Sequence, residues 1–407
     1  MLLRRATLAD GQVVDVRVCG DTIHDLASHD LASHGLTSMA VQPGEQVVDL
    51  GGHLLLPAPA EPHAHLDKAF LAERLPNPTG DLLGAITAMQ LARHELTVAD
   101  TAERAERAAR LMLSNGTTAV RTHADVTQAG GLTSVEALVD VRDRLADLMH
   151  IEIVALTGWP AIGPEGAEQR ALLRDAIDAG ADVVGGAPHL ETDPAAANAQ
   201  FLEIAAEAGL PVDLHVDESL DPAALGLEDL ARRVLDSGFP HAVTASHCVS
   251  LSTLCAARQQ EIAELVAAAG ISVVALPHTN LFLQARGVHT APARALAPVK
   301  TLWRAGVNVC AGADNLQDPF NPMGRGDALE TAMLLVLTAH ALPDEAYSSV
   351  SRAARLAMGL VPNDIAPGRR ADLLAVRATT VREAMAMMPS PRWVLSGGRV
   401  VGGETER

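Results

Sequence analysis

Six short segments of the chain end in side chains that bind metals or transfer protons. They are EPHAHLD with His63 and His65, VRTHADV with His123, VDLHVDE with His215 and Glu218, VTASHC with His247, VVALPH with His278, and VCAGAD with Asp314. Each follows an apolar, β-branched run, which predicts that these side chains lie at the carboxyl tips of strands. Parallel α/β barrels carry their active sites on that face. The pattern indicates a hydrolase with a metal centre.

A candidate metal site begins with the H-x-H pair. His63 and His65 are two residues apart on one predicted strand, so both imidazoles point to the same side and can share a cation. Alone, such a pair has the simpler interpretation of two polar residues at a strand end. His215 and Asp314 complete a set of three imidazoles and one carboxylate, which suits a divalent transition metal and leaves room for water.

Two further residues are candidates for moving protons. Glu218 lies three residues after His215, and His247 ends the next predicted strand. A bound metal lowers the pKa of water to about 7 in favourable zinc sites. Glu218 can then carry a proton to a substrate nitrogen, while His247 orients the nucleophile. Each residue alone could equally be a solvated loop acid or a satisfied core histidine; together with the ligand set they favour catalysis.

The elements that must position these residues alternate along the chain. Strand-like runs such as TTAVRTHADV and PVDLHVDE are separated by helical stretches, and counting HLLLPAPAEPHAH as the first strand gives eight β/α units. This arithmetic predicts a TIM barrel over residues 58–361, with an extra helical insertion between His65 and His123. Residues 1–57 and 362–407 are β-rich and are expected to pair as a small second domain.

Composition limits the partners. The 407 residues are 48% hydrophobic and 20% charged, with a net charge of −19. Such acidity disfavours nucleic acid, no apolar run is long enough to span a membrane, and the four scattered cysteines favour a cytoplasmic protein with a small-molecule substrate. The evenly spaced His24, His29 and His34 lie in a short repeat that we interpret as an expanded surface turn rather than a metal-binding tract.

The motifs together resemble the amidohydrolase superfamily, in its cytosine deaminase-like branch, and are also similar to the isopropylaminohydrolases of N-isopropylammelide. The resemblance rests on EPHAHLDKAF, VRTHADV, DLHVDE, VTASH, NLFLQAR, VNVCAGADNLQDPFNPMG and APGRRADLLAV. It implies a distorted TIM barrel with a small β-sandwich formed by both termini. It also implies one Zn²⁺ or Fe²⁺ ion held by His63, His65, His215 and Asp314. Glu218 would be the proton shuttle, His247 would stabilise the nucleophile, and Asp314 would also act as the base. A homo-oligomer is expected.

The same resemblance suggests substrate contacts. His189 stands where binuclear relatives have a bridging lysine, which implies a mononuclear site. Gln284 and Arg286 lie in the segment that contacts substrate, although they could equally anchor the loop. Phe320 could stack on a planar ring, and His123 completes this group of candidates. Asp67 and Lys68 directly follow the H-x-H pair and could form a structural ion pair or reach into the cleft.

Two departures argue against cytosine itself as the substrate. Gly158 and Trp159 stand where cytosine deaminases carry a glutamine, and Asn315 replaces an aspartate beside the metal ligand. Losing matched hydrogen-bond partners changes substrate preference strongly. We therefore predict hydrolytic deamination of another cyclic amidine, such as isocytosine, creatinine, a pterin or a triazine. Release of an alkylamine or opening of a cyclic amide is the alternative, and a non-catalytic binding barrel is disfavoured because Glu218 and His247 are present.

Overall fold

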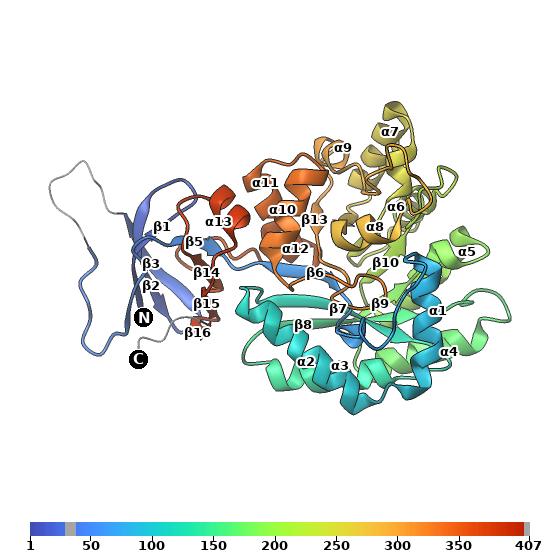
Figure 1. Ribbon diagram of the computed structural model, residues 1–407, viewed down its shortest axis with the longest axis horizontal. Helices are drawn as coiled ribbons and strands as arrows, with labels where there is room; N and C mark the ends of the chain where they lie inside the picture. Colours follow the sequence, from blue (N-terminus) through green and yellow to red (C-terminus); the bar gives the residue numbers. More distant parts are fainter. Residues whose placement is uncertain (29–37, 403–407) are drawn as a thin grey trace.

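Eight parallel strands form a nearly closed barrel in the computed structural model, which describes residues 1–28 and 38–402 (Figure 1). The barrel strands are paired in chain order and are β6 (Ala60–Ala64), β7 (Ala119–Val126), β8 (His150–Thr157), β9 (Val183–Gly186), β10 (Val212–Val216), β11 (Val243–His247), β12 (Ser272–Ala275) and β13 (Val309–Ala311). The backbone N–H of Asp314 donates to the carbonyl of His63 at 3.0 Å, which brings the last strand back beside the first. The predicted distorted TIM barrel is confirmed.

Helices follow the strands and cover the barrel from outside (Figure 1). Their bounds are α1 (Leu82–Ala92), α2 (Val98–Ser114), α3 (Thr133–Leu145), α4 (Ala167–Asp178), α5 (Pro194–Ala208), α6 (Gly226–Ser237), α7 (Ala256–Ala268), α8 (Pro277–Leu283), α9 (Val299–Arg304), α10 (Ala328–Thr338), α11 (Pro343–Ser349), α12 (Arg352–Ala357) and α13 (Val381–Met387). As predicted, α1 and α2 form a helical insertion between β6 and β7, with the short 3-10 helix η2 (Arg93–Glu95) between them.

The barrel forms because its strands are buried on both faces. Every residue of β7, β10 and β11 is buried, and these strands are rich in valine and alanine. Parallel sheets covered by helices show this kind of continuous apolar run. The surrounding helices bury one face each; α6, for example, buries Leu227, Leu230 and Val234 on a single stripe. Polar side chains on the buried strands therefore need a specific reason to be there.

The two ends of the chain form a second sheet, as predicted. Its strand order is β16-β15-β14-β5-β1-β2-β3, with β4 paired to β1. The strands are β1 (Leu2–Thr7), β2 (Val13–Cys19), β3 (Thr22–Ser28), β4 (Val47–Asp49), β5 (Leu54–Pro57), β14 (Leu373–Val376), β15 (Trp393–Ser396) and β16 (Arg399–Gly402). In Figure 1 this sheet lies beside the barrel and combines the blue and red ends of the chain. The domain boundaries at 57/58 and 361/362 stay predictions.

The prediction that HLLLPAPAEPHAH forms one barrel strand is wrong. The structure divides this segment into β5, in the terminal sheet, and β6, in the barrel. Pro57 and Pro59 have no N–H to donate, so a continuous hydrogen-bonded strand is interrupted there.

Two smaller expectations concern the periphery. His24 is exposed in β3, whereas His29 and His34 lie outside the described residues. Among the residues that the structure describes, no helix combines the length and apolar character needed to cross a membrane.

Candidate active site

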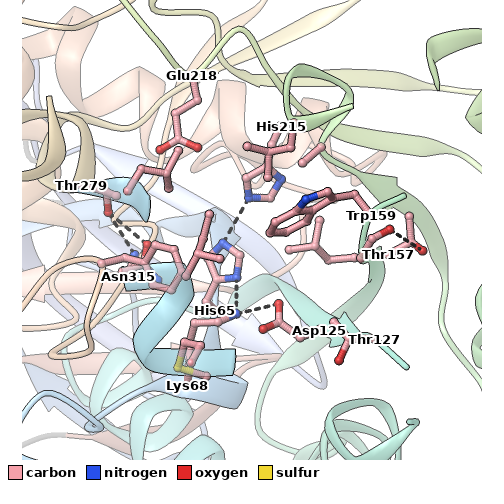
Figure 2. A pocket seen from close by; sticks show the side chains of 18 of the residues that line it. His65, Lys68, Asp125, Thr127, Thr157, Trp159, His215, Glu218, Thr279 and Asn315 are labelled. Carbon is pink, nitrogen blue, oxygen red and sulfur yellow. Dashed lines mark hydrogen bonds and ion pairs between the residues drawn. The ribbon is translucent and has the colours of Figure 1, made fainter. Parts of the chain in front are cut away.

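Four predicted ligands converge inside the mouth of the barrel. The Nε2 atom of His65 lies 3.2 Å from Asp314 Oδ1 and 3.3 Å from His215 Nε2. The Nε2 atom of His63 lies 3.6 Å from the same Asp314 oxygen. All four side chains are buried. Figure 2 shows His65 and His215 facing each other from different strands. The sequence placed these residues on separate strand tips, and the fold brings their ligand atoms together.

The donor set fits a divalent metal. His63 Nε2 and both carboxylate oxygens of Asp314 are buried and have no hydrogen-bond partner within the described chain. Burial and the neighbouring imidazoles lower the pKa of His63 and His215 well below the usual value, so both rings are neutral, the form that binds metals. Burial alone would raise the pKa of Asp314, but the adjacent rings of His65, 3.2 Å away, and of His247 hold it below its ordinary value. Unpaired lone pairs at this density indicate a cation site.

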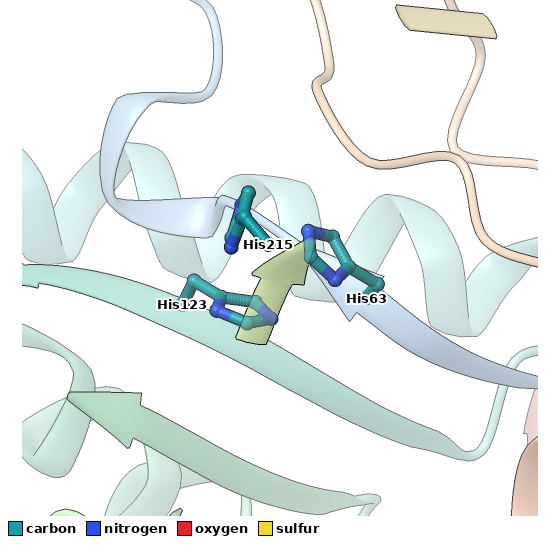
Figure 3. A group of neighbouring side chains, drawn as sticks. All are labelled: His63, His123 and His215. Carbon is teal, nitrogen blue, oxygen red and sulfur yellow. The ribbon is translucent and has the colours of Figure 1, made fainter. Parts of the chain in front are cut away.

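A second group of possible ligands overlaps the first. His63, His123 and His215 also place one nitrogen each within 4.8 Å of one another (Figure 3). The rings of His63 and His123 are 4.0 Å apart, tilted by 35°. His123 is fully buried and does not line the cavity described below. Its predicted contact with substrate stays a prediction.

A hydrogen-bonded chain holds His63 from behind. His63 Nδ1 lies 2.8 Å from Ser246 Oγ, and that hydroxyl donates to Asp213 Oδ1 at 3.0 Å. Because Ser246 uses its proton on Asp213, its oxygen accepts from the N–H of His63. The proton on Nδ1 leaves the lone pair of Nε2 free for a metal.

The backbone is strained at the carboxyl ends of the strands that carry the site residues. Asp217, His247, Cys248 and Asp314 have φ values of 50°, 70°, 49° and 63°. This left-handed region is uncommon for residues with a side chain and costs of order 1–3 kcal/mol per residue. Such strain persists where surrounding structure enforces it, and it turns His247 and Asp314 into the barrel mouth.

Glu218 lies between two histidines at the edge of the cavity. Its Oε1 atom is 3.6 Å from His247 Nδ1, and its Oε2 atom is 3.8 Å from His189 Nε2. Burial raises the pKa of Glu218 well above the ordinary value, and the nearby charge of Asp314 adds to the shift. The carboxyl group can therefore hold a proton at neutral pH, as a general acid requires.

The two histidines each present an acceptor nitrogen. His247 Nδ1 lies 3.0 Å from Asn280 Oδ1, and His189 Nδ1 lies 2.9 Å from the backbone carbonyl of His215. Both acceptors fix the proton on Nδ1 and leave Nε2 with a lone pair. Burial lowers the pKa of His247, and it lowers that of His189 to about 4. Both rings are neutral at physiological pH.

A cavity opens above the ligand set. Its walls include the predicted substrate residues Trp159, His189, Asn315 and Phe320 (Trp159 and Asn315 are labelled in Figure 2). Asn315 is held in place, because its Oδ1 accepts from Thr279 at 3.3 Å and its Nδ2 donates to Asp318 at 2.8 Å. The cavity is mainly apolar with a few oriented polar groups, as expected of a site for a small ring.

The structure places Gln284 and Arg286 beside the cavity rather than in its walls. Gln284 Nε2 donates to the backbone carbonyl of Glu218 at 3.0 Å, and Arg286 stacks on Phe282 at 4.1 Å from the ring centre. Gln284 therefore supports the loop that carries Glu218. His278, which the sequence predicted at a strand tip, lies instead in α8, 3.5 Å from Glu330, and is also absent from the lining.

Sequence reasoning missed a polar group on the other side of the cavity. Lys68 has both of the roles that the sequence allowed, a structural ion pair and a place in the cleft. It forms an ion pair with Asp67 at 3.1 Å, and it lines the cavity. Lys68 Nζ also donates to Asp125 Oδ1 at 2.9 Å, and Arg93 pairs with the other oxygen of Asp125. Asp125 could have been noticed, because it lies two residues after His123 on the same strand; Arg93, in a helical insertion, carries no such signal.

The fold and the site define a barrel hydrolase with a site suited to a metal, and comparison with known proteins specifies the family. Residues 72–402 match the amidohydrolase family. A pterin deaminase of Rhizobium rhizogenes (strain K84) is 31% identical over 406 residues, covering 97% of this chain and 86% of that protein. The solved structure of 5-methylcytosine deaminase from Klebsiella pneumoniae superimposes with a TM-score of 0.90 at 30% identity, covering 100% of this chain and 99% of that one.

N-isopropylammelide isopropylaminohydrolase from Burkholderia multivorans superimposes with a TM-score of 0.84 at 29% identity, over 98% of this chain and 97% of that one. The chain therefore belongs to the amidohydrolase family. The predicted resemblance, and the prediction of an enzyme that hydrolyses carbon–nitrogen bonds, are confirmed.

Proposed function

We propose that this protein removes an amino group from a small N-heterocycle by hydrolysis, at a single divalent metal held by His63, His65, His215 and Asp314. The predicted reaction class is confirmed by the relatives, which include deaminases of pterin and 5-methylcytosine. Zn²⁺ or Fe²⁺ is the proposed ion, because the donor set of three imidazoles and a carboxylate suits both. When bound, such an ion would supply an activated water near neutral pH.

The buried Glu218 is the observation that carries this proposal. It stands beside the ligand set with its pKa raised well above the ordinary value by burial, and it lines the cavity in which a ring would bind. Glu218 would give its proton to the ring nitrogen next to the carbon under attack, which makes that carbon more electrophilic. It would then take a proton from the added water and pass it to the amino group, so that ammonia leaves and a ring carbonyl remains.

The neighbouring side chains would support these transfers. His247 presents its Nε2 lone pair 4.0 Å from Asp314 Oδ2, where it can accept a hydrogen bond from the attacking water. Asp314 would take the first proton from that water, since its pKa is lowered and it stays ionised. His189 would accept a hydrogen bond from an N–H of the substrate. Trp159 and Phe320 would lie against the faces of the ring.

A second candidate function keeps the same residues but expels an alkylamine. The apolar cavity lining by Leu156, Trp159 and Leu190 favours it, because an N-alkyl group could be buried there. The similarity to the isopropylaminohydrolase at 29% identity supports the same alternative. A cytoplasmic homo-oligomer is the proposed working form.

The direct test is amine release by purified protein loaded separately with Zn²⁺ and Fe²⁺. The panel contains cytosine, isocytosine, creatinine, pterin, aminotriazines and N-isopropylammelide, with Glu218→Gln as the blank. Ammonia from one ring but not from cytosine would support deamination and implicate Gly158, Trp159 and Asn315 in specificity. Isopropylamine from the last compound would favour the second candidate. Silence across the panel, with metal bound at one per chain, would reject both.

A further inference from the structure

The cavity extends beyond the ligand set to a second polar group formed by Lys68, Arg93 and Asp125. All three residues line the cavity. Lys68 Nζ lies 3.0 Å from His65 Nδ1 and 2.9 Å from Asp125 Oδ1, and Asp125 Oδ2 pairs with Arg93. Figure 2 shows Lys68 and Asp125 on the opposite side of His65 from Glu218. The ring of His65 therefore separates this group from Glu218.

Arg93 is held in place but has unused donors. Its side chain is 11% exposed, one terminal nitrogen is fixed by Asp125, and its buried Nε has no hydrogen-bond partner within the described chain. A guanidinium carries five N–H donors in a rigid plane and pairs well with carbonyl and carboxylate oxygens. A buried donor without a partner is costly to maintain, so it points to a ligand that completes it.

The distance from His65, beside the ligand set, to Arg93 suits an extended substrate. Three polar contacts join His65 to Arg93 by way of Lys68 and Asp125. At about 3 Å for each contact, plus the width of the Asp125 carboxylate, His65 and Arg93 are at most about 10 Å apart. Apolar side chains also line the cavity: Ile86 and Met89 from α1, and Leu156 and Trp159 from β8 and the loop after it. A flat, apolar ligand with polar groups at both ends, such as a fused two-ring heterocycle, matches this cavity lining.

We propose that Arg93 is a specificity-determining residue whose guanidinium binds an oxygen acceptor, carbonyl or carboxylate, at the end of the substrate opposite the carbon that is attacked. This inference rests on the proposed function and narrows it to amino-substituted heterocycles that extend past the reacting ring. Asp125 and Lys68 are positioning residues, because they fix the guanidinium and do not need to contact the substrate themselves.

A purely structural role for Arg93 makes a different prediction. If the ion pair with Asp125 did no more than fasten η2 to β7, its loss would weaken every ligand equally. Binding of a carboxylate to the guanidinium would instead affect ligands that carry the acceptor. The ratio of two affinities separates these roles, whereas activity alone does not.

The test measures quenching of pterin fluorescence by metal-loaded Glu218→Gln protein, in which turnover is blocked. The probes are pterin and pterin-6-carboxylate, which share the reacting ring. The carboxylate probe should bind at least about ten-fold more tightly, since charge-assisted hydrogen bonds contribute factors of about 10–100. Adding Arg93→Gln should remove that advantage and leave pterin binding within about two-fold. Arg93→Lys should retain part of it, and Arg110→Gln, on the exposed face of α2, is the matched control.

Equal loss for both probes in the Arg93 variants, or an unchanged ratio, would overturn the inference. Should Arg93→Gln not fold, Arg93→Lys decides the matter, because it keeps a cation beside Asp125 but lacks the planar fork. If the wild-type enzyme ignores both pteridines yet releases amine from a one-ring substrate, this inference fails while the proposed function stands. If no ring in the panel reacts, the proposed function itself fails.

Discussion

Glu218 is a buried carboxyl group whose neighbours do not hold it ionised. The two rings that face it, His189 and His247, have pKa values lowered by burial, and Asp314 contributes a negative charge. A carboxyl group in this environment keeps its proton at a pH where an exposed glutamate has lost it. The fold thus prepares one acid for proton delivery while the lowered pKa of Asp314 keeps a second carboxylate ionised.

The first prediction concerns Glu218→Gln. We expect kcat to fall by about 10²–10⁴-fold, because glutamine cannot exchange a proton with the substrate. Metal content and thermal stability should stay close to wild type, since the amide has the same size. Glu207→Gln, an exposed glutamate on α5 that pairs with Arg174, is the control and should be fully active. A fully active Glu218→Gln enzyme would mean that the proton is carried by another group.

The second prediction concerns Ser246, which does not line the proposed substrate cavity. Ser246→Ala removes the acceptor for His63 Nδ1 and the donor to Asp213. We expect metal affinity to drop by about 10–100-fold, the usual cost of losing such support behind a ligand. Competition with a chelator of known affinity measures this directly. Ser114→Ala, exposed at the end of α2, should bind metal as the wild type does.

At the scale of elements, the sequence predicts where the barrel strands end, but it does not predict all the contacts between elements. Apolar runs ending in His215, His247 and Asp314 revealed the strand tips, because parallel strands share one functional face. The pairing of Arg93 with Asp125 could not be foreseen, since it depends on how α1 and η2 fold back over β7. The division of β5 from β6 was missed because both short segments are buried and follow one another closely, and only their partners in different sheets distinguish them.

The third prediction concerns Arg121, which ties four strands together inside the barrel. From β7 it reaches Glu152 on β8 at 2.6 Å, Asp213 on β10 at 2.9 Å and Thr244 on β11 at 3.0 Å. Arg121→Met leaves the buried Asp213 and the partly buried Glu152 without their cation, so the free energy of unfolding should fall by about 3–5 kcal/mol. Denaturant titration measures this loss.

The double variant Arg121→Met with Asp213→Asn tests the same network. It should recover part of the stability, because one of the uncompensated charges is removed. Burial raises the pKa of Asp213 to about 6 even with Arg121 present, which shows how much this carboxylate depends on its partner. A single variant as stable as Arg110→Met, at an exposed site on α2, would contradict this role.

At the scale of the whole molecule, the terminal sheet is joined to the barrel by buried polar contacts. Asn363 Nδ2 donates to the carbonyl of Ala58 at 3.0 Å, and the hydroxyl of Tyr347 donates to the carbonyl of Pro57 at 2.7 Å. Both contacts hold the segment between β5 and β6, where the chain passes from one sheet to the other. These contacts thus hold the chain just before β6, the strand that carries the proposed metal ligand His63.

The strongest of these connections is the pair of Arg392 with Asp327. The guanidinium, just before β15, donates to both carboxylate oxygens at 2.8 and 2.7 Å, and to the carbonyl of Asn115 at the end of α2 at 2.7 Å. Asp327 also caps α10 by accepting from the backbone N–H of Leu329 at 3.0 Å. Both side chains are buried. One residue of the terminal segment therefore fixes two barrel helices.

The last prediction follows from that geometry. Arg392→Met should lower the free energy of unfolding by about 3–5 kcal/mol, because the buried Asp327 is left with only the exposed Arg325, 3.9 Å away, as a cation. Since Arg392 lies outside the cavity lining, kcat well below the melting temperature should change less than two-fold. Arg399→Met, exposed on β16 of the same sheet, should have wild-type stability. Calorimetry and amine release, measured on the same preparations, separate the two effects. An Arg392→Met protein as stable as the wild type would show that this ion pair does not hold the sheet to the barrel. A stability loss accompanied by an equal loss of kcat would show that the sheet positions the proposed metal ligands.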